Sequence, residues 1–152
     1  MLHYLTVFFI SMVPVVELRG AIPAGIAMGL PPLAVLLVSV LGNIVPVPFV
    51  ILFIRRILSW MMRRGGALQK AASFLKTKAE RGAELFYKYE LLGLFILVAI
   101  PLPGTGAWTG ALVSAMLEIR LKKAIPLIAL GVLTAGIVML CISYGAGVLF
   151  RP

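Results

Sequence analysis

Two long runs without a charged residue constrain this chain more than any other feature of its sequence. The first lies between Arg19 and Arg55 and is interrupted at Pro31-Pro32, which leaves residues 33–54 as one candidate span. The second covers residues 124–150. About 20 helical residues cross the hydrocarbon core of a bilayer, so each run is long enough for a transmembrane helix. Of the 152 residues, 62% are hydrophobic and 12% are charged, whereas soluble domains carry about a quarter charged residues. The sequence therefore predicts an all-α integral membrane protein that forms a single transmembrane domain over residues 1–152.

Two further apolar runs are interrupted at their centres. Residues 4–30 are interrupted by Pro14, Glu17, Arg19, Gly20 and Pro23, and residues 91–117 by the segment from Pro101 to Gly106. Proline removes a backbone donor and disfavours helix at the residue before it. Each remaining leg covers only about half of the bilayer core. We expect each run to fold as a re-entrant hairpin of two half-helices, with its broken tip covered by protein or water.

The distribution of positive charge favours re-entrant hairpins over ordinary spans kinked by proline. Residues 55–90 contain nine Lys or Arg and three Glu, so the positive-inside rule predicts that this segment is cytoplasmic. If residues 91–117 enter the membrane and return, the basic residues within 118–123 are cytoplasmic as well. A complete crossing would place them outside. We expect a multi-pass protein of the prokaryotic cell (inner) membrane.

The two interrupted runs also align with each other. Val13-Pro14 superposes on Ile100-Pro101, and at the same offset Gly20 falls on Ala107, Ala24 on Ala111 and Ala27 on Ser114. Each run is followed by a turn and an intact span. Because one full crossing separates the two units, the second is inverted relative to the first. We expect two inverted repeats, residues 1–58 and 89–152, an architecture of transporters whose substrate site lies between the repeats.

An amphipathic linker, residues 59–88, is expected to join the repeats. Apolar residues recur there at helical spacing, at Leu68, Ala71, Ala72, Leu75, Ala79, Ala83 and Phe86. Most lysines and arginines of the segment lie off this stripe, a pattern typical of a helix lying on the membrane surface. A solvated loop is the alternative interpretation.

Glu17 and Arg19 are the charged residues of the first interrupted run. Each charge at the bilayer centre costs about 3 kcal/mol even on lenient scales, so intramembrane charges indicate either a function or a mutual partner. The functional hypothesis is that Glu17 takes up and releases a proton while Arg19 binds an anionic group. The structural hypothesis is an ion pair that locks the hairpin.

The second interruption has no charge, and its candidate residues are Pro101, Pro103, Gly104, Thr105 and Gly106. A half-helix starting near Thr105, with Thr105 as its N-cap, would direct backbone N–H groups at the membrane midplane and attract an anion. The glycines allow close approach of a ligand or of another backbone. Asn43, beside Pro46 and Pro48, is a candidate cavity residue, and Trp108 a candidate for stacking on a ligand. For Asn43 the alternative is that it satisfies backbone groups exposed by the prolines, and for Trp108 the alternative is a packing role.

Enzymatic and nucleic-acid functions find little support. The chain has no Asp, one His and one Cys, and it contains no catalytic triad, metal-ligand cluster or nucleotide-binding loop. We therefore expect no catalytic residue, no metal and no cofactor. The net charge of +9 is attributed to the positive-inside rule rather than to nucleic-acid binding.

Three motifs carry a family resemblance. Residues 13–23, VPVVELRGAIP, residues 41–48, LGNIVPVP, and residues 100–110, IPLPGTGAWTG, resemble the small multidrug export protein family over essentially the whole chain. That family resembles the larger DedA superfamily. The resemblance implies re-entrant hairpins in inverted repeats, and members of the superfamily are implicated in moving polyprenyl-phosphate and other lipids. Glu17 matches the acidic residues near the first tip of DedA-like proteins. Their second-repeat arginines have no match here, because the buried arginine is Arg19.

These observations predict a secondary transporter or flippase for an amphipathic, anionic substrate such as a lipid phosphate, with proton coupling as the candidate energy source. The alternatives are an exporter of hydrophobic cations and a membrane scaffold that transports nothing. The expected partners are membrane lipids and a proton or other coupling ion. A homodimer is one way to cover both broken tips from lipid.

Overall fold

The computed structural model describes residues 1–82, 90–102 and 104–149, and these residues form helices and short connections. The all-α prediction is confirmed for this part of the chain. Two helical stretches are long and apolar enough to cross a membrane, Pro32–Arg64 and Leu121–Gly145. They contain the two uncharged runs of the sequence, apart from the last residues of the second run.

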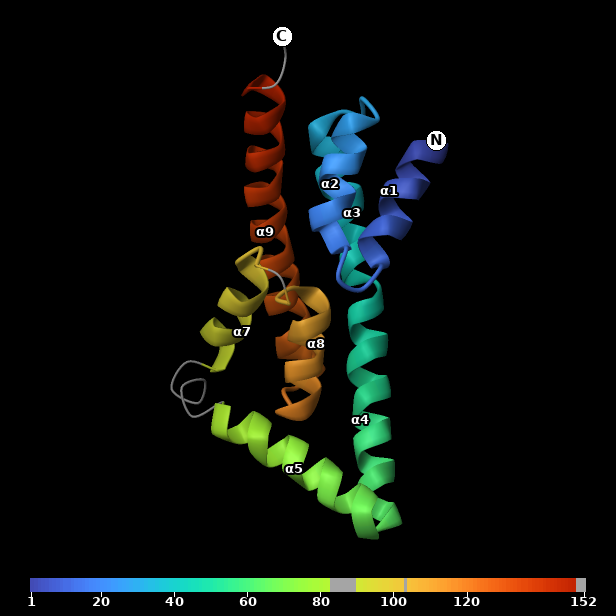
Figure 1. The fold of residues 1–152 in the computed structure, drawn as a ribbon, viewed down its shortest axis with the longest axis vertical. Helices are drawn as coiled ribbons and strands as arrows, with labels where there is room; N and C mark the ends of the chain where they lie inside the picture. Colours follow the sequence, from blue (N-terminus) through green and yellow to red (C-terminus); the bar gives the residue numbers. More distant parts are fainter. Residues whose placement is uncertain (83–89, 103, 150–152) are drawn as a thin grey trace.

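The first half of the chain is a helical hairpin followed by a long helix. Helices α1 (Leu2–Met12) and α2 (Glu17–Ala27) form the hairpin, whose turn lies at mid-height of the molecule in Figure 1. Helices α3 (Pro32–Ile44) and α4 (Pro46–Arg64) then run end to end through Val45. Proline suits the first turn of a helix, where its missing N–H costs no hydrogen bond. This explains why both helices begin at a proline.

The second half repeats this order of elements. Helix α5 (Gly66–Gly82) crosses one end of the molecule, and α7 (Glu90–Ala99) and α8 (Ala107–Met116) form a second hairpin that faces the first (Figure 1). The long helix α9 (Leu121–Leu149) follows. Residues 59–64 of the expected linker are the last residues of α4, and Gly66–Gly82 of the linker form α5. Ala83 and Phe86 of the predicted stripe lie outside the described residues.

The helices pack in a reciprocal way. Each first leg lies against the long helix of its own half, α1 on α3 and α7 on α9. Each second leg also lies against the long helix of the other half, α2 on α9 and α8 on α4. Small residues permit this closeness. A Cβ at Gly110 of α8 would come within 2.6 Å of Val98 on α7, and one at Gly131 of α9 within 2.7 Å of the same side chain.

Large apolar side chains cover much of the surface. On α3, Leu33, Leu37 and Leu41 recur every four residues and are at least half exposed, and Phe49 and Phe53 continue the stripe on α4. Soluble proteins rarely expose apolar patches of this extent. Lipid is therefore the expected solvent for the long helices.

Candidate functional site

The turn of the first hairpin has a strained backbone. Val15 and Glu17 have φ angles of +75° and +48°, which L-residues other than glycine seldom adopt. Such strain persists only where surrounding contacts hold it, and it is frequent at functional sites. The turn directs Glu17 and Arg19 toward the second hairpin.

The carboxylate of Glu17 lies at the N-terminus of α8. Glu17 is 3% exposed, and its Oε1 accepts a hydrogen bond of 3.2 Å from the backbone N–H of Trp108. The N–H of Ala107 also faces the carboxylate. A negative charge is stabilised there by the free N–H groups and by the positive end of the helix dipole.

Gly106 makes this contact possible. It is the N-cap of α8 with a φ of +128°, and a Cβ at this position would collide with the Glu17 carboxylate. The prediction that Thr105 is the N-cap is therefore wrong. The Thr105 Oγ1 lies instead 2.7 Å from the carbonyl oxygen of Ile100, within the same turn.

Arg19 binds the turn that precedes α8. Its Nη2 donates hydrogen bonds of 2.7 Å to the carbonyl oxygen and to the Oγ1 of Thr105, and its Nη1 donates to the carbonyl oxygen of Leu102. Among the described residues, the salt bridge joins Lys76 to Glu118, at 2.8 Å. Glu17 and Arg19 thus bind across to the second hairpin and are not paired with each other.

The second hairpin contacts the first in return. The indole Nε1–H of Trp108 donates a hydrogen bond of 3.3 Å to the carbonyl oxygen of Met12, at the end of α1. That carbonyl is one of the acceptors a helix end leaves unsatisfied. We refer to the contacts of Glu17, Arg19, Thr105, Gly106 and Trp108 as the tip junction.

Asn43 of α3 lies beside the tip junction. Its side chain is fully buried, and neither amide atom has a hydrogen-bond partner among the described residues. It lines a small pocket together with both charged residues and parts of α7, α8 and α9, namely Glu17, Leu18, Arg19, Val98, Gly106, Ala107, Val132 and Ala135. This pocket has no room for a water-sized molecule, so the junction is closed.

Pro101 and Gly104, two further predicted site residues, do not line this pocket. Pro101 is half-buried and Gly104 is exposed in the turn, while Pro103 lies outside the described residues. The described residues contain no cluster of His, Cys, Asp or Glu that could hold a metal ion.

Sequence reasoning missed Arg55. This α4 side chain donates through Nη2 to the carbonyl oxygen of Ile119 and, at 3.4 Å, to that of Ser114. It thus contacts the C-terminal end of α8, where a positive charge complements the helix dipole. The one available signal was its place as the first basic residue after the uncharged run.

The fold and the site define a small helical membrane protein in which two facing hairpins meet at a buried polar junction. The family model described as "Putative small multi-drug export protein" matches residues 17–138, and the chain belongs to this family. The match covers α2 of the first hairpin, α3, α4, the second hairpin and the first part of α9. Comparison with curated proteins found no match, and neither did comparison with solved structures.

Proposed function

We propose that the protein is a transporter for an amphipathic, anionic substrate, with the α1–α2 and α7–α8 hairpins as re-entrant elements of two inverted repeats. The lengths of the legs support this: α1 and α2 have 11 residues each, and α7 and α8 have 10. Each leg is therefore about 15 Å long, half of a hydrocarbon core of about 30 Å. The packing of α2 on α9 and of α8 on α4 supports the two inverted repeats. We propose further that the protein is related to the DedA superfamily.

One observation carries the mechanism: the Glu17 carboxylate occupies the end of α8 that is suited to binding an anion. Protonation of Glu17 would remove its charge and weaken its hold on the Trp108 and Ala107 N–H groups. The N-terminus of α8, together with Arg19, would then be available to an anionic head group. Proton and substrate binding are coupled in this scheme, because ionised Glu17 and the substrate compete for the same donors.

Few other charged groups among the described residues lie near Glu17. Among the residues that line the junction pocket, Arg19 is the other charged one, and α3 contributes the neutral Asn43. The α7, α8 and α9 residues of the lining are glycine, alanine and valine. The pH dependence of transport should therefore report chiefly on Glu17.

Transport in proteoliposomes tests the proposal. A fluorescent anionic phospholipid serves as the probe, and its movement between leaflets is followed by chemical quenching across a range of pH. We expect Glu17→Gln to abolish the pH dependence. Glu118→Gln is the matched control, since it also removes one carboxylate, but at an exposed site. Unchanged pH dependence in Glu17→Gln would overturn the assignment of Glu17.

Export of hydrophobic cations is the second candidate, and the family description favours it. Glu17 would then bind the cation directly, and Glu17→Gln would abolish transport of a probe such as ethidium. A membrane scaffold is the third candidate, and the closed junction is compatible with it. It predicts that the wild-type protein moves neither probe.

The proposed placement puts residues 55–90 and 118–123 in the cytoplasm, with α5 along that face of the inner membrane. Lipids would cover the long helices, and a second copy of the chain would cover the hairpins. The energy source would be a proton or another coupling ion.

A further inference from the structure

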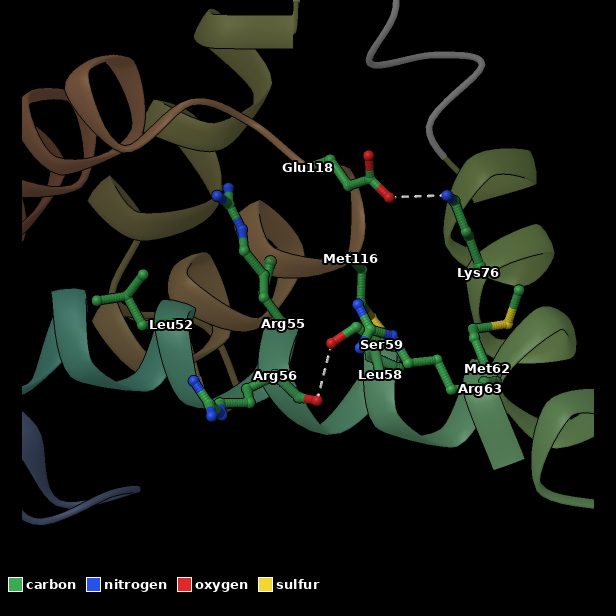
Figure 2. Close-up of a pocket in the computed structure, with 12 residues that line it drawn as sticks. Leu52, Arg55, Arg56, Leu58, Ser59, Met62, Arg63, Lys76, Met116 and Glu118 are labelled. Atoms are coloured by element: carbon green, nitrogen blue, oxygen red, sulfur yellow. Dashed lines mark hydrogen bonds and ion pairs between the residues drawn. The ribbon is translucent and has the colours of Figure 1, made fainter. Parts of the chain in front are cut away.

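A large cavity lies at the end of the molecule where α4 meets α5. Its volume is about 960 Å³, and it is open on one side and lined by α4, α5, the end of α8 and the following loop (Figure 2). Ligand pockets typically have volumes of about 300–1,000 Å³. The cavity is separated from the tip junction by the length of α8, about 15 Å. It is therefore a second site.

The lining of the cavity carries an excess of positive charge. Arg55, Arg56, Arg63 and Lys76 contribute four positive charges, and Glu118 contributes one negative charge. Two of the four have contacts within the protein: Arg55 donates to the carbonyl oxygen of Ile119, and Lys76 pairs with Glu118 at 2.8 Å. This excess favours an anionic ligand.

Arg56 and Arg63 are the remaining cations. Among the described residues, neither guanidinium has a hydrogen-bond or salt-bridge partner, and both side chains are exposed. They are seven positions apart on α4, two helical turns, and therefore share one face of the helix. Guanidinium groups bind phosphate oxygens in pairs of parallel hydrogen bonds.

Apolar side chains form the other part of the lining. Leu52 and Met62 of α4 are 52% and 42% exposed, and Met116 of α8 lies across from them (Figure 2). The cavity thus places an apolar wall beside a cluster of arginines. A free phosphate would use only the arginines, whereas an acyl chain would also cover the apolar wall.

The neighbouring residues mark a membrane interface. Trp60 is half exposed, and the Arg64 guanidinium stacks over its ring at 4.9 Å. Trp residues concentrate at the level of the lipid head groups. In the membrane placement proposed above, on which this inference rests, the cavity opens at the head groups of the leaflet that α5 lies on.

We propose that this cavity binds an anionic phospholipid, with the phosphodiester on Arg56 and Arg63 and an acyl chain along Leu52, Met62 and Met116. This lipid need not be the transported substrate. Binding is measured on the detergent-solubilised protein and does not require transport. A failure of lipid binding and a failure of the proposed transport function are therefore distinguishable.

The experiment compares two double variants by native mass spectrometry with phosphatidylglycerol and phosphatidylcholine. Arg56→Gln/Arg63→Gln removes the proposed phosphate ligands. Lys122→Gln/Lys123→Gln removes two exposed cations of the same end of the molecule that lie outside the cavity. We expect the arginine variant to lose about thirtyfold in affinity for phosphatidylglycerol. Each lost arginine–phosphate contact should lower the affinity by about fivefold, and the two losses multiply. The lysine variant should bind as the wild type does.

Three outcomes would overturn the proposal. Equal losses in the two variants would indicate general attraction to a positive surface. Equal binding of phosphatidylcholine would show that charge does not select the ligand. Competition by inorganic phosphate as strong as that by long-chain phosphatidylglycerol would assign the cavity to a soluble anion. Thermal unfolding of both variants in detergent verifies that they are folded.

Discussion

Glu17 and Arg19 show how two charges can lie within a membrane protein without neutralising each other. Each charge binds backbone groups of the second hairpin: Glu17 accepts from the N–H of Trp108, and Arg19 donates to the carbonyl oxygens of Leu102 and Thr105. The N–H of Trp108 is one of the donors that a helix start leaves unsatisfied, and the two carbonyl oxygens lie in the turn that precedes α8. The charges and the broken backbone therefore stabilise one another.

Gly106 offers a test at the scale of one residue. We expect Gly106→Ala to destabilise the protein by more than Gly104→Ala. Both positions have positive φ, +128° and +83°, so both substitutions introduce backbone strain of about 1–3 kcal/mol. A Cβ at Gly106 would in addition displace the Glu17 carboxylate, whereas none of the described atoms lies within 4 Å of one at Gly104. Thermal unfolding in detergent measures the difference, and equal losses would contradict the close packing of Glu17 on Gly106.

Individual residues were predictable where the chemistry was unusual for its surroundings. Glu17 and Arg19 stand out because charge within an apolar run is costly. Thr105 was misplaced as the N-cap because a hydroxyl is the usual cap. Here the cap position needs a residue without a side chain, since a side chain of the other hairpin fills the space. That contact is not a local property of the sequence.

At the scale of elements, α8 is held at both ends by charges from the first half of the chain. Glu17 of α2 lies at its N-terminus and Arg55 of α4 at its C-terminus. Both signs are those that the helix dipole favours. Any movement of α8 along its axis would therefore weaken at least one contact.

The loop after α8 supplies a pH-dependent contact, which lies outside the membrane in the placement proposed above. The hydrogen bond from Lys76 and its positive charge hold the pKa of Glu118 below its usual range. A lowered pKa means that the contact stabilises the fold while Glu118 is ionised, and that this stabilisation is lost as the pH falls through the pKa of Glu118 in the folded protein. An exposed pair of this kind contributes less than about 1 kcal/mol.

Spin labels on α5 and α9 measure this effect. With cysteines at Ser73 and Leu121 in a Cys141→Ser background, we expect the distance distribution to broaden as the pH is lowered from neutral until Glu118 is protonated. Glu118→Gln should give the broad distribution at every pH. A narrow distribution in Glu118→Gln at neutral pH would show that Lys76 and Glu118 do not hold α5 in place.

Helix breaks were the most predictable elements, because proline acts locally. The turns around Pro14 and Pro101 lie where the sequence predicted interruptions, and α3 starts at Pro32. The expected interruption at Pro23 is absent, because Pro23 lies inside α2. The continuation of α4 to Arg64 was not anticipated. Basic residues are good helix formers and do not end a helix by themselves, although they mark where an apolar run ends.

At the scale of the whole molecule, the two halves cannot be separated without exposing polar backbone. Each hairpin satisfies groups of the other, and each second leg packs on the long helix of the opposite half. We therefore expect neither half to fold alone in a membrane mimic.

Membrane topology is a further prediction at this scale. In a Cys141→Ser background, single cysteines replace the exposed Ser73, Lys122 and Gly29 and are labelled with a membrane-impermeant maleimide. We expect Ser73→Cys and Lys122→Cys to react from the same side, and Gly29→Cys from the opposite side. This result follows if α7 and α8 enter the membrane and return. Labelling of Lys122→Cys together with Gly29→Cys would instead establish a complete crossing.

Asn43 bears on the balance between conformations. A buried amide without hydrogen-bond partners raises the free energy of the folded state by about 1–3 kcal/mol. Among the described residues the Asn43 amide has no partner, so Asn43 lowers the population of the closed arrangement. Any arrangement in which the amide reaches water or a ligand recovers that free energy and gains population. We expect Asn43→Leu, which is of similar size, to raise the unfolding temperature and to slow the exchange between states that transport requires. The polar residue that weakens the resting protein would then be the one that keeps it able to open.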